Sequence, residues 1–186
     1  MEPRLNEASQ YGVTIQPTAS APAWRAVRVR RLSPEANAGR NNIFVKVLTA
    51  TGERDRDPSL RIGWTWEGRR LDEQAPLVPL SKNDNETGHG DIPMTTMNQR
   101  ISVWIVGGGI PSDVVAGMHT NHPDEWPGST RGHFSYEVIF QRAQGVAVEP
   151  DLPVDGDSLA ELRMVIAAMQ KQLDEMRAIL QRWDGE

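Results

Sequence analysis

The sequence contains no cysteine, and its 186 residues carry a formal net charge of −5. Without thiols the chain cannot form disulfide scaffolds, thiolate zinc sites, iron–sulfur clusters or a cysteine nucleophile. The negative balance argues against a nucleic-acid partner, because nucleic-acid-binding domains are usually strongly basic. No apolar run approaches the roughly 18 residues of a membrane-spanning helix, and the first residues lack the apolar stretch of a secretory signal. We therefore expect neither a nucleic-acid nor a membrane partner.

Apolar residues are nevertheless sufficient for a core, and turn-forming residues are frequent. Hydrophobic residues make up 38% of the chain, which also has 16 Gly and 13 Pro. This length and composition predict one globular domain with an appendage. Residues 1–23 are polar and punctuated by prolines, so we expect an extended N-terminal arm that a neighbouring subunit holds in place. The alternative is that this arm packs on its own domain.

Residues 24–142 alternate between apolar and polar positions as β-strands do. The segment 43–48 is β-branched on one face, and 101–106 is apolar on both faces, which predicts a central strand. The arginine-rich segment 24–32 predicts an edge strand whose outer face meets water or a protein partner. Further strands are expected at 60–66, 77–80, 114–118 and 134–141. Because no helical period interrupts them, the fold class is mainly β, an antiparallel β-sandwich of immunoglobulin-like or jelly-roll type.

After an acidic Pro/Gly linker at 143–157, the period of the sequence changes to that of a helix. Apolar residues over 158–184 recur at alternating spacings of three and four, which is a heptad seam. The seam consists of Leu159, Leu162, Ile166, Met169, Leu173, Met176, Leu180 and Trp183. We predict a coiled-coil helix that joins copies of the chain, with a trimer favoured because Val165 and Ile179 widen the stripe. Docking of this helix on its own sheet or on a different protein are the alternatives.

The first candidate for chemistry is the set of four histidines, which all lie within one part of the chain: His89, His119, His122 and His133. The segment 119–125 combines His119 and His122 with Asp124 and Glu125, which are metal-ligand types. No helix aligns them, however, so we interpret this segment as a hydrogen-bonded loop and predict no metal site.

Two other motifs are also given structural interpretations. His133 and Ser135 share a face of a predicted strand but lack a nucleophile elbow, so we expect outward polar positions and no catalytic residues. The run of three glycines at 107–109 precedes no helix, which predicts a hairpin loop and not a phosphate cradle.

The chain is rich in tryptophan, with six Trp against two Tyr and three Phe. Trp64, Trp66 and Trp104 alternate with other apolar residues, so we expect them in the core. Trp126 is expected in a loop and is the tryptophan best placed for a ligand or a neighbouring subunit, although packing within the loop is our structural interpretation of it. A sugar-binding site would combine Trp126 with His119, His122 and Asp124, because exposed indole rings stack on sugar rings.

A polar arm, a cysteine-free β-sandwich and a short heptad helix together resemble the trimeric decoration, fibre and head-spike modules of tailed bacteriophages. The stretch Ser112-Asp113-Val114-Val115 through His119-Thr120-Asn121-His122-Pro123-Asp124-Glu125 to Gly132-His133-Phe134-Ser135-Tyr136 also looks like the end of sandwich modules in phage structural and bacterial surface proteins. The resemblance implies a non-enzymatic structural or attachment protein of a virion, made in the host cytoplasm. Its partners would be its own copies and capsid or tail proteins, and it implies no cofactor. The alternative is a carbohydrate-binding module for surface adhesion, with a metal-dependent enzyme third.

Overall fold

The computed structural model describes residues 5–70, 72–73, 76–125 and 133–144. The chain divides into two units, Met1–Val146 and Ala147–Glu186, and the description concerns the first. The predicted coiled-coil helix, most of the predicted linker and Trp126 lie outside the described residues. Within those residues the protein is mainly β, as the alternation predicted.

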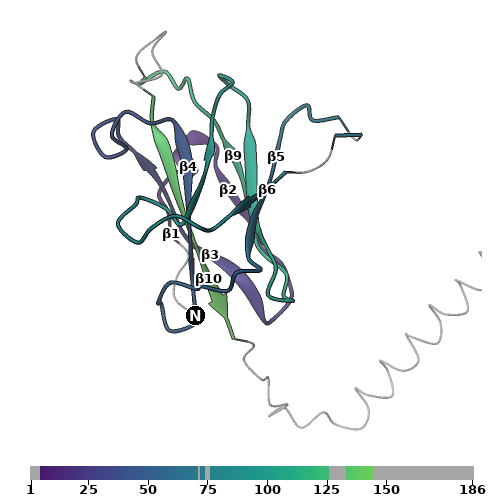
Figure 1. Ribbon diagram of the computed structural model, residues 1–186. Coiled ribbons are helices and arrows are strands. Elements are labelled where there is room, and N and C mark those ends of the chain that lie inside the picture. Colours follow the sequence, from purple (N-terminus) through teal and green to yellow (C-terminus); the bar gives the residue numbers. More distant parts are fainter. Residues whose placement is uncertain (1–4, 71, 74–75, 126–132, 145–186) are drawn as a thin grey trace, which may run out of the picture. The chain divides into compact units, whose positions relative to one another are not determined.

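The strands form two five-stranded sheets, which Figure 1 shows as two layers. Sheet A has the order β1 (Leu5–Asn6), β3 (Ala23–Leu32), β10 (Ser135–Ala143), β4 (Asn42–Leu48) and β7 (Gly90–Pro93). Sheet B has the order β2 (Thr14–Gln16), β9 (Val114–Met118), β8 (Ile101–Val106), β5 (Arg61–Trp66) and β6 (Leu77–Pro79). A short 3-10 helix, η1 (Ser9–Tyr11), lies between β1 and β2.

The core lies between the two sheets, where alternate residues of each strand meet. Val45 and Val138 of sheet A and Ile62 and Val103 of sheet B are fully buried in one hydrophobic cluster. Burying each such side chain contributes about 1.5–3 kcal/mol. The two-residue alternation that predicted the strands therefore also predicted which face of each strand builds the core.

Sheet A is not purely antiparallel, which differs from the predicted antiparallel sandwich. β10 pairs in parallel with β4, and β1 pairs in parallel with β3, whereas β10 and β3 are antiparallel. Parallel neighbours need a long crossover connection. Between β4 and β10 the chain supplies that crossover by building β5, β6, β8 and β9 of sheet B, so no crossover helix is required.

One predicted strand position within the sheets is confirmed, and another differs by one strand. β8 is the central strand of sheet B, as its apolar residues on both faces predicted. β3 lies next to the edge of sheet A, with only the two-residue β1 beyond it. Its last arginine, Arg31, pairs in register with Tyr136 and shares a face with the buried Val29. Arg31 therefore belongs to the inner side of the strand, not to the outward arginine face that the sequence predicted.

Residues 5–16 fold on their own sandwich, which differs from the expected arm held by a neighbour. β1 adds to the edge of sheet A and β2 to the edge of sheet B, and Ala8 and Val13 between them are buried in the core. Gly117, at the bulge of β9, allows the backbone of this segment to approach closely because it has no side chain. Its φ is +89°, and a Cβ on it would come within 2.6 Å of the Gly12 carbonyl oxygen.

The three tryptophans of sheet B lie on both of its faces. Trp64 and Trp66 are partly buried against the core, on the inner face as predicted. Trp104 is not a core residue, because it alternates with the buried Val103 and Ile105 and so lies on the outer face. The expectation for Trp104 was wrong because apolar character on both sides of a strand does not show which side is inside.

Candidate functional site

The most elaborate arrangement of polar side chains lies at one end of the sandwich, around Arg31. The Arg31 side chain is only 4% exposed and its guanidinium lies 4.0 Å from the ring centre of Tyr11 and 3.6 Å from that of Phe134. It donates hydrogen bonds to Asp124 (2.9 Å) and Glu125 (2.8 Å). Although burial opposes it, these hydrogen bonds raise the pKa of Arg31, so the guanidinium stays charged. One cation thus ties together η1, β3, the 119–125 segment and the start of β10.

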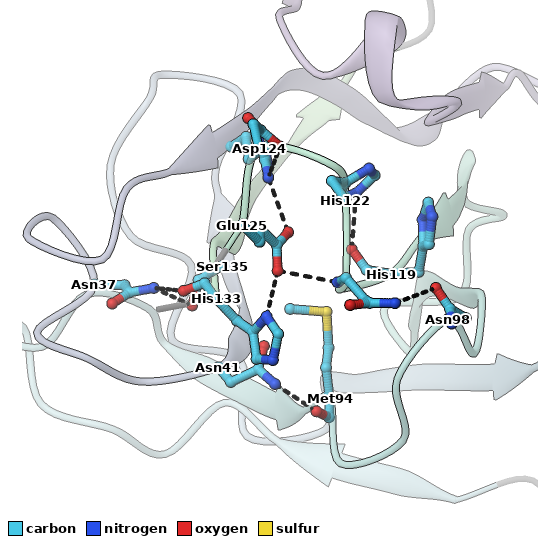
Figure 2. A network of polar contacts seen from close by, with 12 residues as sticks. Asn37, Asn41, Met94, Asn98, His119, His122, Asp124, Glu125, His133 and Ser135 are labelled. Carbon is cyan, nitrogen blue, oxygen red and sulfur yellow. Dashed lines mark hydrogen bonds and ion pairs between the residues drawn. The ribbon is translucent and has the colours of Figure 1, made fainter. Parts of the chain in front are cut away.

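Glu125 is the buried anion of this network, and Figure 2 shows its carboxylate pointing toward the His133 ring. One carboxylate oxygen accepts from Arg31, and the other accepts from the backbone N–H of Asn121 (3.0 Å) and lies against Nδ1 of His133. Burial raises the pKa of this carboxyl, but the hydrogen bond from Arg31 and the others outweigh it and hold the pKa below its usual value. Glu125 is therefore ionised and fully partnered at neutral pH.

His122 and Tyr136 form the second half of the network. Nε2 of His122 lies 2.9 Å from the Tyr136 hydroxyl, and that hydroxyl donates to the His119 carbonyl oxygen at 3.0 Å. The His119 and His122 rings are 4.2 Å apart, and Tyr11 meets His122 edge-on. Burial, with the nearby His119 and the positive Arg31, lowers the pKa of His122, whereas burial raises that of Tyr136. Both rings are therefore neutral at pH 7.

Ser135 lies at the start of β10 in a separate set of hydrogen bonds. Its hydroxyl accepts from the Asn37 side chain (2.9 Å) and the Asn42 backbone (3.0 Å), and donates to the Arg40 carbonyl oxygen (2.8 Å). Ser135 and His133 are both buried, which corrects the prediction that they are outward polar positions. The hydroxyl proton points at a carbonyl and not at a base, so the geometry does not activate Ser135 as a nucleophile.

The sequence-predicted ligand residues are partly brought together. The His119 and His122 rings contact each other at an interplanar angle of 58°, and Asp124, although its side chain is 50% exposed, is paired with Arg31. Trp126 lies outside the described residues. His89 is remote from this cluster and accepts a hydrogen bond from the Val47 backbone through Nδ1. Among the described residues no three His, Asp or Glu side chains are arranged to hold a metal ion.

The residues that organise the cluster were not predicted from the sequence, namely Arg31, Tyr11, Phe134 and Tyr136. One signal was present, because Arg31 stands two positions after Val29 and so falls on the core face of its strand. An arginine on a core face requires a buried carboxylate partner. Asp124 and Glu125 could have been sought on that ground.

The cluster links several segments of the chain at one end of the sandwich through hydrogen bonds and a buried ion pair. Arg31, Glu125 and His122 each face a partner inside the protein, and the N-terminal segment, β3, β10 and the 119–125 segment all contribute to it. Removing Arg31 or Glu125 would deprive the other buried charge of an ionic partner, which is strongly destabilising. The arrangement therefore stabilises the fold.

Comparison with known proteins does not assign the chain to a family. No protein-family model, curated protein or solved structure matches the chain. Within the part of the chain that the structure describes, no helix has the length and apolar character needed to span a bilayer.

Proposed function

We propose that the protein is a non-enzymatic structural or attachment module that assembles through residues 158–184, with a homotrimer favoured. The observation that carries the proposal is the unbroken three–four spacing of apolar residues from Leu159 to Trp183, which follows the sandwich in the sequence. A strict 3.5-residue repeat is what a coiled coil requires, and a helix docked on a sheet would follow 3.6.

The globular part supports this proposal by its construction. Arg31, Glu125 and Glu137 form ion pairs with other residues of the same chain, and these pairs stabilise the sandwich. Glu137 sits between Arg30 and Lys46 on the outer side of sheet A. A braced domain carried on a self-associating helix suits a component of a larger assembly. From the resemblance to phage decoration, head-spike and fibre modules we infer that this assembly is a virion, with capsid or tail proteins as partners.

The test is the mass of the full chain in solution, measured by sedimentation equilibrium at micromolar concentration. We expect the wild type to be a trimer and Ile166→Asp/Leu173→Asp to be a monomer, because both changes place charge in the seam. Ala178→Asp is the matched control. In the predicted heptad, position 178 falls opposite the seam, so this change should leave the mass unchanged. A wild-type protein that is monomeric under these conditions would overturn the proposal.

Carbohydrate binding at the 119–126 loop is the alternative function, and the geometry does not favour it there. Nε2 of His122 faces Tyr136 and the His119 carbonyl oxygen, and both Asp124 oxygens accept from Arg31. A sugar would have to compete with these contacts for the hydrogen-bonding groups it needs.

A further inference from the structure

Trp104 occupies an unusual position on the outer face of sheet B. It pairs in register with Gly63 of β5, and an ideal Cβ on Gly63 would come within 2.5 Å of Cε2 and Nε1 of the indole. The ring of Trp104 therefore covers the Gly63 backbone. Glycine is required at this position because any side chain would displace the ring. Trp104 remains only half-buried, so part of the indole still meets solvent.

The register of sheet B extends this surface across three strands. Leu77 of β6 pairs with Gly63 from the other side, so Trp104, Gly63 and Leu77 stand in one row across β8, β5 and β6. Leu77 is 53% exposed and is one of the few large hydrophobic side chains in the described residues that is exposed. The row thus presents an indole and an aliphatic side chain on the outer face of sheet B.

Polar side chains flank the row on the same face. Arg61 pairs with Val106, and Thr65 pairs with Ser102, so a residue able to hydrogen bond stands on each side of Gly63 along β5. Thr65 accepts a hydrogen bond from Arg69, which leaves its hydroxyl proton to donate. The aromatic ring of Trp104 therefore lies between hydrogen-bonding residues that occupy alternate positions of two paired strands.

This combination matches the chemistry of a pyranose ring. One face of such a sugar is made of C–H groups, whose slight positive charge is attracted to the negative face of an indole. Its hydroxyls project around the edge, where Arg61, Thr65 and Ser102 stand. A protein interface of standard size needs about 800 Å² per partner with an apolar centre, and here polar positions interrupt the face on both sides of the row. A nucleic acid would meet a chain of net charge −5.

We propose that the outer face of sheet B is a carbohydrate-binding surface on which a neutral pyranose stacks on Trp104. The proposal does not depend on the assembly proposed above. The two would reinforce each other, because several copies of a weak sugar site in one oligomer raise the avidity for a multivalent glycan. This surface is distinct from residues 119–125, where His122 and Asp124 are hydrogen-bonded to Tyr136 and Arg31.

The test uses the full chain labelled with 5-fluorotryptophan, in which the six ¹⁹F resonances are assigned by single Trp→Phe replacements. Cellohexaose, xylohexaose, maltohexaose and chitohexaose are titrated separately to millimolar concentration. We expect at least one of them to shift the Trp104 resonance while the buried Trp24 resonance stays in place. Trp104→Leu keeps an apolar side chain over Gly63 but removes the aromatic face, and should weaken binding more than tenfold. His119→Ala in the loop should leave the affinity unchanged.

Three outcomes would overturn the proposal. No oligosaccharide shifts Trp104, or Trp104→Leu binds as tightly as the wild type, or the Trp104 resonance moves with protein concentration and not with sugar. The last result would assign the surface to contact between copies of the chain. The sedimentation mass of Trp104→Leu separates this failure from that of the assembly proposal, because the variant should retain the wild-type oligomer.

Discussion

Arg31 is the residue on which the polar end of the sandwich depends most. Replacing it with Met keeps a similar volume between Tyr11 and Phe134 but leaves Glu125, whose side chain is 1% exposed, without its cationic partner. Breaking a buried ion pair from one side costs about 3–5 kcal/mol. We expect Arg31→Met to lower the free energy of unfolding by that amount, measured by urea denaturation of the full chain at pH 7.

The matched control for Arg31→Met is Arg28→Met on the same strand. Arg28 pairs with Glu7, and both side chains are 40% exposed, so water solvates the charges when the pair is lost. An exposed pair of this kind contributes less than about 1 kcal/mol. If the two replacements lower the free energy of unfolding equally, the buried ion pair of Arg31 does not contribute more to stability than an exposed one.

His89 gives the fold a pH dependence that can be isolated with one variant. Burial, followed by the positive charges of Arg54 and Lys46, lowers the pKa of His89 to about 4. In the unfolded chain a histidine has a pKa of about 6.5, so between these values the unfolded state binds the proton more readily. The stabilisation is thus fully present above pH 6.5 and is lost as the pH falls toward 4.

We expect this loss to reach about 3 kcal/mol, since each pKa unit corresponds to about 1.4 kcal/mol. The measurement is the difference in unfolding free energy between wild type and His89→Asn from pH 7 to 4. The Asn side-chain oxygen can accept the hydrogen bond that the Val47 N–H donates to Nδ1 of His89. Because the variant does not titrate, the wild type should lose stability faster on acidification. Parallel curves would show that His89 is not held neutral by the fold.

The packing of residues 5–16 on the sandwich can be tested by replacing neighbouring buried and exposed residues. Val13 is buried, whereas its neighbour Thr14 is exposed at the start of the edge strand β2. Val13→Asp places an unpaired charge in the core and should cost several kcal/mol. Thr14→Asp adds the same charge in water and should change the unfolding free energy by less than about 0.5 kcal/mol. Equal and negligible effects would mean that residues 5–16 do not pack on the sandwich.

Elements were predictable from the sequence where their period was long enough to read. β4, β8 and β9 lie within a residue of the expected positions, because each has five or more residues with a clear apolar face. β1, β2 and β7, which have two to four residues, were missed, whereas the equally short β6 was expected at 77–80. The parallel pairing of β10 with β4 was missed because pairing direction depends on topology and not on local pattern.

The candidate site was less predictable than the strands, for a related reason. His119, His122 and Asp124 were found because they are close in sequence and rich in functional groups. Their organiser, Arg31, is 93 positions away from Asp124, and only the folded register brings the two together. Trp104 was assigned to the wrong face because Gly63, the residue that makes room for it, lies on a different strand.

At the scale of the whole molecule, the division at residues 146 and 147 predicts that the sandwich is independent of the segment that follows. The described core is closed by residues of its own unit, from Val13 near the start to Phe140 in β10. A protease site inserted after Pro150 tests this independence. After cleavage and removal of the C-terminal fragment, the sandwich should unfold cooperatively, with a free energy within about 1 kcal/mol of the uncut protein, and sediment as a monomer. A sandwich that unfolds on cleavage would place part of its stability in residues 151–186, and one that stays oligomeric would place the self-association in the sandwich and not in the heptad seam.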